Sequence, residues 1–170
     1  MPNQHSRRPI IRRSVVAAIA IAAGACTGPH TPVDPASGTP MAIAAPAGNT
    51  WTASVDVLAG RHLPIRTMDR ASGLIVVDPI RVNPSGAVAE LSSTAHPWAD
   101  CGSIEHEYYQ PNLASYSVRV RSADAGSTVT LAITFSAANA GSPPRPCTSK
   151  GVLEAELGKE IKEHAERRSP

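Results

Sequence analysis

Four residues near the middle of the chain have side chains that bind transition metals. His96, Cys101, Glu105 and His106 lie within eleven residues of one another, and imidazole, thiolate and carboxylate groups are all zinc ligands. Their spacings match no strong zinc motif, and the next cysteine, Cys147, is distant in sequence. Because His and Glu in polar loops are usually solvated, we predict no metal site and no cofactor.

The sequence lacks the motifs of nucleophilic and metal-dependent active sites. There is no G-x-S-x-G or H-E-x-x-H segment, and no cysteine stands in a C-x-x-C pair. Two pairs of acids could act as general acid and base, Glu105 with Glu107 and Glu154 with Glu156. The first pair lies in a loop and the second on a charged helix, so we predict that both are solvated and that the chain is not an enzyme.

The remaining cysteine, Cys26, is the first in the chain and ends an apolar N-terminal segment. Residues 1–13 contain four arginines and no acid, and an apolar run follows from Ser14 to Ala25. A membrane span needs roughly 20 apolar residues, so this shorter run is typical of a signal peptide over residues 1–25.

The run from Ala23 to Cys26 resembles the bacterial lipobox, in which the cysteine becomes an acylated mature N-terminus. The resemblance implies lipidation of Cys26 with chains such as palmitate. Each buried methylene contributes about 0.8 kcal/mol, so two or three chains would hold a soluble domain to a membrane. An ordinary secretory signal cut nearby is the alternative. Ser6-Arg7-Arg8 also resembles a loose twin-arginine motif, which leaves the export route open.

Lipidation would place the protein at the cell envelope, facing the periplasm or the extracellular side. Thr27 stands where Asp would retain a lipoprotein in an inner membrane, so the outer membrane is favoured if the organism has two. In that oxidising setting, Cys101 and Cys147 form an even pair of thiols. We predict a disulfide, which would close a loop of about 47 residues and contribute about 4 kcal/mol.

The basic character of the chain belongs to its leader. Without residues 1–25, 12 basic residues remain against 14 acids, and the formal charge changes from +2 to −2. The arginines that remain in strand-like segments are scattered, and we interpret them as solvated; they are Arg66, Arg81, Arg119 and Arg121. Nucleic-acid binding needs a basic cluster, so none is predicted.

Two regions follow the leader. Residues 26–48 are rich in Pro, Ala, Gly, Thr and Ser, a composition that predicts a disordered tether. Residues 49–168 are enough for a single domain. At its start, Asn49 or Thr50 could cap a short amphipathic helix that ends near Gly60. The apolar positions assigned to the core face of this helix are Trp51, Val55 and Leu58.

The rest of the domain reads as strands followed by a helix. Leu63 to Asp69 and Leu74 to Val82 predict two strands, with a bulge or edge at Pro79. Residues 87–113 show no sustained hydrophobic periodicity, so we expect a long irregular segment, which we call the excursion. Two further strands show strict alternation around a turn from Ala123 to Gly126. Their inward-facing residues are Tyr116, Val118, Val120, Val129, Leu131, Ile133 and Phe135.

After a proline-rich loop over residues 138–146, Thr148 or Ser149 could cap a final helix. Its apolar residues lie four apart, at Leu153, Leu157 and Ile161. An antiparallel sheet with one apolar face can pack against the apolar faces of both helices. We therefore predict an α+β fold of two layers, in which about four antiparallel strands pack against an N-terminal and a C-terminal helix.

The order of these elements resembles the helix-grip domains of bacterial envelope lipoproteins. The type example is the C subunit of the outer-membrane β-barrel assembly machinery. The likeness covers Trp51 to about Glu166 and rests on three segments, which are Trp51–Leu58, Ile65–Asp69 and Ser72-Gly73-Leu74-Ile75. It implies a helix-grip-like architecture and does not identify a partner.

These observations predict a lipid-anchored, non-catalytic binding or scaffolding module with an envelope protein as partner. Trp98, Tyr108 and Tyr109 lie in the long excursion and could contact that partner, since Trp and Tyr are enriched in binding hot spots. The alternative is that these rings and the disulfide form a small satellite core. A second function would also suit the fold, because a helix held by a curved sheet can enclose a small apolar ligand.

Overall fold

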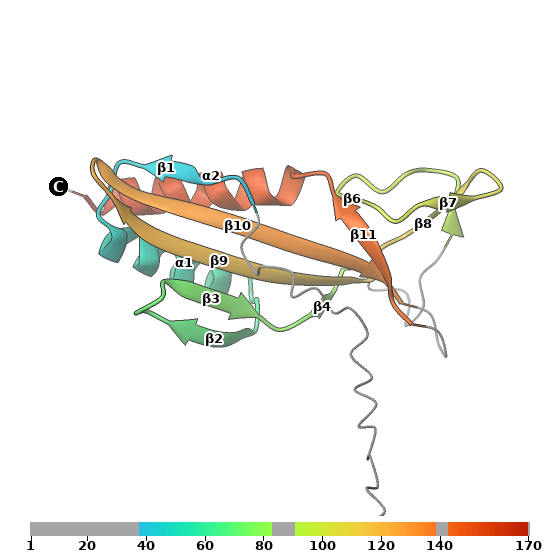
Figure 1. Ribbon diagram of the computed structural model, residues 1–170, viewed down its shortest axis with the longest axis horizontal. Coiled ribbons are helices and arrows are strands. Elements are labelled where there is room, and N and C mark those ends of the chain that lie inside the picture. Colours follow the sequence, from blue (N-terminus) through green and yellow to red (C-terminus); the bar gives the residue numbers. More distant parts are fainter. Residues whose placement is uncertain (1–37, 83–90, 139–142, 170) are drawn as a thin grey trace, which may run out of the picture. The chain divides into compact units, whose positions relative to one another are not determined.

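The structure is a computed structural model that describes residues 38–82, 91–138 and 143–169. It is an α+β fold with a large antiparallel sheet and two helices (Figure 1). The predicted signal peptide, Cys26 and most of the predicted tether lie outside the described residues. The elements are β1 (Met41–Ile43), α1 (Ala47–Gly60), β2 (Ile65–Asp69), β3 (Leu74–Val77), β4 (Ile80–Arg81), β5 (Leu91–Ser92), β6 (Ala99–Asp100), β7 (Ser103–Ile104), β8 (Glu107–Tyr109), β9 (Leu113–Ala123), β10 (Gly126–Ala137), β11 (Arg145–Ser149) and α2 (Val152–Arg167).

The long β9–β10 hairpin forms the centre of the main sheet. Its register pairs Ala123 with Gly126 at the turn and Leu113 with Ser136 at the far end. On one side, β3 and then β4 pair with β9, and β2 follows β3. On the other side, β1 and β11 pair with different parts of β10, and β6 follows β11. The main sheet thus has eight strands, and β5, β8 and β7 form a separate small sheet.

The prediction of about four strands was wrong because short edge strands were not recognised. The second predicted strand divides at Pro79 into β3 and β4, since proline lacks the N–H that a ladder needs. Met41–Ile43 lie in the predicted tether but form β1. Arg145–Ser149, expected to be loop and helix cap, form β11. Strands of two to five residues are too short to show a periodic pattern.

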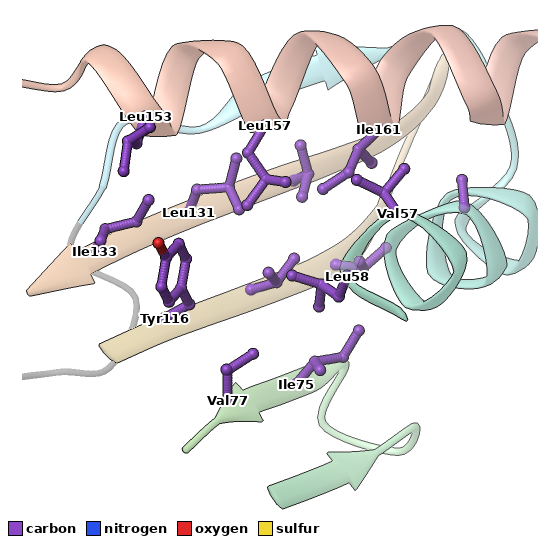
Figure 2. Close-up of a cluster of buried hydrophobic side chains, with 14 of the residues drawn as sticks. Val57, Leu58, Ile75, Val77, Tyr116, Leu131, Ile133, Leu153, Leu157 and Ile161 are labelled. Atoms are coloured by element: carbon purple, nitrogen blue, oxygen red, sulfur yellow. The ribbon is translucent and has the colours of Figure 1, made fainter. Parts of the chain in front are cut away.

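Both helices pack on the same face of the main sheet (Figure 2). Residues that alternate along β9 and β10 supply the sheet side of this core, as the sequence predicted. Burial there raises the pKa of the Tyr116 hydroxyl. The largest fully buried apolar side chains are Ile43, Val57, Leu58, Ile75, Val77, Val118, Val129, Leu157 and Ile161.

The apolar face of α2 is as predicted, but its N-terminal cap is not. Leu153, Leu157 and Ile161 are buried against β10 and α1. The N-cap is Gly151, whose φ of 76° is left-handed. Ser149 lies two residues earlier and accepts a hydrogen bond from the Gly151 N–H at 3.1 Å.

The buried face of α1 differs from the predicted one. The helix begins at Ala47, earlier than expected, and Trp51 and Val55 are only half-buried. The buried side chains are Thr50, Ala53, Ser54, Val57 and Leu58. The prediction assigned only apolar residues to the buried face, so it missed Thr50 and Ser54.

Hydrogen bonds make the burial of Thr50 and Ser54 possible. The Thr50 and Ser127 hydroxyl oxygens are 2.7 Å apart, and Ser127 donates its own hydrogen to the Ala45 carbonyl at 2.8 Å. Thr50 is therefore the donor to Ser127. Ser54 donates to the Thr50 carbonyl at 2.8 Å. Because each buried hydroxyl has a partner, the desolvation cost that disfavours polar groups in a core is offset.

Gly73 is required where the β2–β3 turn meets β9. Its φ is 69°, and a Cβ there would lie 2.0 Å from the Val120 carbonyl oxygen. Gly73→Ala should therefore lower the free energy of unfolding by about 2 kcal/mol, through left-handed strain and displacement of the turn. Denaturant unfolding would measure the loss. Gly60→Ala is the control, because nothing lies within 4 Å of its added Cβ; equal losses for the two variants would contradict this account.

Candidate functional site

The residues considered as metal ligands do not form a common site. Cys101 is bonded to Cys147, so neither sulfur is a thiolate ligand. His96 accepts the Trp98 N–H at Nδ1, 3.3 Å away, and burial, followed by the charge of Lys150, lowers the pKa of its imidazole. Glu105 and His106 are exposed in the turn between β7 and β8. Within the described ranges, no three His, Cys, Asp or Glu residues are grouped so that they could hold a metal ion.

The predicted Cys101–Cys147 disulfide is present. Cys101 directly follows β6 and is buried, while Cys147 lies in β11 at the register position opposite Phe135 of β10. Beside the bridge, β6 pairs with β11 through Asp100 and Ala99. The disulfide therefore links the segment that contains β6, β7 and β8 to β11 of the main sheet.

The three aromatic residues proposed for partner binding lie in different environments. Trp98 is half-buried against the main core and meets the His96 ring edge-on, with centroids 5.3 Å apart. Tyr109 is half-buried, with the Arg145 guanidinium carbon 4.5 Å from its ring centroid. Tyr108 is 37% exposed. Because successive strand residues face opposite sides, Tyr108 and Tyr109 cannot act on one surface.

The small sheet has an exposed apolar residue that the sequence did not single out. Ile104 of β7 is 49% exposed. Its register partner on β8 is Glu107, whereas that of Tyr108 is Ser103, so Ile104 and Tyr108 lie on opposite faces of the small sheet. The small sheet of β5, β8 and β7 lies beyond β6 and β11, near the start of α2 (Figure 1). It therefore presents one large apolar side chain to solvent on each of its two faces, on a segment that the disulfide holds in place.

A cavity of about 670 Å³ lies beside β10. Its position follows from the sheet: β1 pairs with residues 127–129 of β10 and β11 with residues 135–137. No described strand covers this edge between them. The N-cap and first turn of α2 lie over it, and the lining includes Met41, Leu131, Ile133, Cys147, Glu154 and Ala155.

The cavity combines apolar walls with one carboxylate. Glu154 accepts the Ser149 hydroxyl at Oε1, 2.7 Å away. Its Oε2 is shielded from solvent and has no hydrogen-bond partner among the described residues. Drug-sized ligands occupy cavities of this volume, with mostly apolar walls and few polar groups. The arrangement can therefore hold a small ligand with an apolar body.

The sequence contained little signal for this cavity. β10 reads as one uninterrupted strand, and nothing in it marks where its outer partner changes from β1 to β11. Pro40 is the one local hint, because it directly precedes β1 and a proline cannot donate to the ladder.

Comparisons with known proteins do not place the chain in a family. No protein-family model matches the sequence, and no curated protein matches it significantly. Among the described residues, neither helix has the length and apolar character needed to cross a bilayer.

Proposed function

We propose that the chain is a lipid-anchored cell-envelope protein that acts as a non-catalytic binding or scaffolding module. Acyl chains on Cys26 would hold it to a membrane, with the outer membrane favoured if two exist. Support for a helix-grip-like architecture comes from the two helices on one face of the antiparallel sheet.

The observation that carries this proposal is the exposure of the Tyr108 side chain on the small sheet. Large apolar side chains that stay in water are candidates for burial against a partner. The disulfide restrains the segment, so less conformational entropy would be lost on binding than from a free loop. The partner we propose is another envelope protein.

Site-specific photo-crosslinking of the lipidated chain in its native envelope tests the proposal. A photoreactive amino acid at Tyr108 should capture a discrete protein partner. Met68 is a matched control, because it is also a large apolar residue and is 58% exposed on β2. The same Tyr108 variant with Cys26→Ala should leave the membrane fraction. Equal capture from Tyr108 and Met68, or a Cys26→Ala chain that stays in the membrane, would contradict the proposal.

The cavity beside β10 favours a second candidate function, a carrier of small apolar ligands. Its volume and its Leu131 and Ile133 walls support this alternative. Native mass spectrometry distinguishes the two. A carrier should release a small molecule on denaturation, and Ala155→Trp, which adds bulk at the cavity wall, should reduce the amount bound. Crosslinking at Tyr108 should be unaffected by that substitution.

A further inference from the structure

The two acids near the start of α2 lie in different environments, although the sequence suggested that both are solvated. Glu156 is exposed, whereas Glu154 is half-buried and lines the cavity beside β10. The Ser149 hydroxyl donates to Glu154 Oε1 at 2.7 Å, and the Gly151 N–H donates to the Ser149 oxygen at 3.1 Å. These hydrogen bonds hold the Glu154 carboxylate at the N-terminal end of α2, so the prediction of a solvated side chain holds for Glu156 only.

No cation balances the charge of Glu154. It takes part in none of the ion pairs among the described residues, and no described Lys, Arg or His lines the cavity. Lys150, the nearest basic residue in sequence, donates to the His96 carbonyl at 2.7 Å. The first turn of a helix favours a negative charge, but this leaves Oε2 without a hydrogen-bond partner among the described residues. The carboxylate therefore has an unused acceptor beside an apolar cavity.

The apolar walls of the cavity are held by close packing. Leu131 and Ile133 lie on the face of β10 that α2 covers (Figure 2). Met41 of β1 packs with Leu131 against Gly158 of α2, where an added Cβ would lie 2.8 Å from Met41 Cε and 3.2 Å from Leu131 Cδ1. A Cβ on Gly38 would overlap the Leu131 carbonyl oxygen, so the segment that leads into β1 lies directly on β10. Such walls need little rearrangement when a ligand binds.

We propose that the cavity beside β10 binds a single-chain amphiphile with a protonated amine, whose ammonium group pairs with Glu154. This inference rests on the carrier function given above as the second candidate, and it names the class of ligand. A hydrogen bond between charged groups is about twice as strong as a neutral one, and an unmade hydrogen bond at a shielded oxygen is costly. A fatty acid would bring a second carboxylate to a wall without a cation, and like charges repel.

Isothermal titration calorimetry with two probes of equal chain length tests the selection of charge. The full chain with Cys26→Ala would be titrated with decylammonium and with decanoate, each below the concentration at which it forms micelles. Decylammonium should bind about tenfold or more tightly, because it alone gains a charge-assisted hydrogen bond. Ala155→Trp, which adds bulk at the cavity wall, should weaken the binding of decylammonium about fivefold or more.

Two charge-matched variants of α2 locate the amine. Glu154→Gln keeps the shape of the side chain and an oxygen that can accept the Ser149 hydroxyl. It should reduce the preference for decylammonium over decanoate to less than about threefold. Glu156→Gln removes the same charge from an exposed position outside the cavity. It should change the preference less than about twofold. Denaturant unfolding of both variants checks that each is folded.

Lysophosphatidylethanolamine separates two sources of the amine, because it is a single-chain membrane lipid. Binding of this lipid that depends on Glu154 assigns a lipid ligand, whereas binding of decylammonium alone assigns a soluble amine. Equal affinities for decylammonium and decanoate, a preference that survives Glu154→Gln, or equal effects of the two glutamate variants would overturn the amine proposal and leave the carrier function in place. Binding of neither probe would overturn both.

Discussion

Removal of the Cys101–Cys147 bridge is expected to lower the free energy of unfolding by about 4 kcal/mol. The bonded residues are 46 positions apart, so the bridge closes a long loop in the unfolded chain and reduces its entropy. Domains of this size are stable by only about 5–15 kcal/mol, so the loss would be a large share. The excursion would also lose its covalent link to the main sheet.

The comparison uses Cys101→Ala with Cys147→Ala, because alanine at buried position 101 introduces no hydroxyl. Denaturant unfolding would give the free energy and its dependence on denaturant. A reducing agent should destabilise the parent by the same amount and leave the double variant unchanged. A loss below about 1 kcal/mol would mean that the bridge adds little restraint to the unfolded chain.

Ile161→Ala in α2 is expected to cost about 3 kcal/mol, the second large effect. The Ile161 side chain is fully buried and points toward Val57 of α1 in Figure 2. Truncation removes three carbons from a site where α2, α1 and the sheet all meet. The surrounding side chains are held by two helices and a long hairpin, so they can only partly fill the space.

Val152→Ala is the matched control on the same helix, since Val152 is 39% exposed. It should change the free energy of unfolding by about 0.5 kcal/mol or less. Thermal or denaturant unfolding of both variants would measure the difference. Similar losses at positions 161 and 152 would show that the described face of α2 is not the one that carries the packing energy.

Strong local patterns predicted the centre of the fold. The alternation of apolar and polar residues along β9 and β10 placed both strands and their turn. The four-residue spacing from Leu153 to Ile161 identified the buried face of α2. These predictions succeed because residues at a regular spacing along a long strand or helix point in the same direction. A buried face therefore appears in the sequence as apolar residues at a fixed spacing.

Predictions failed where a contact distant in sequence replaced the local rule. α1 buries Thr50 because Ser127, on a strand far along the chain, accepts the hydrogen bond of the Thr50 hydroxyl. β1 and β11 are strands only because β10 offers them an edge. Neither partner can be read from a segment of a few residues.

The candidate binding features divide in the same way. The disulfide could be predicted from the count of cysteines and the inferred compartment, and Tyr108 from its residue type. The cavity beside β10 could not, because it lies where the outer partner of β10 changes from β1 to β11, and neither pairing is visible in the sequence.

By itself, the sequence determined the α+β class, the central hairpin, the buried stripe of α2 and the pairing of Cys101 with Cys147. Each of these follows from periodicity within a segment or from the number of residues of one type. Only the tertiary structure decided where the outer partner of β10 changes from β1 to β11, and that the N-terminal end of α2 lies beside the cavity there. Such sites are made of residues from separate elements, and their proximity depends on how the whole chain packs.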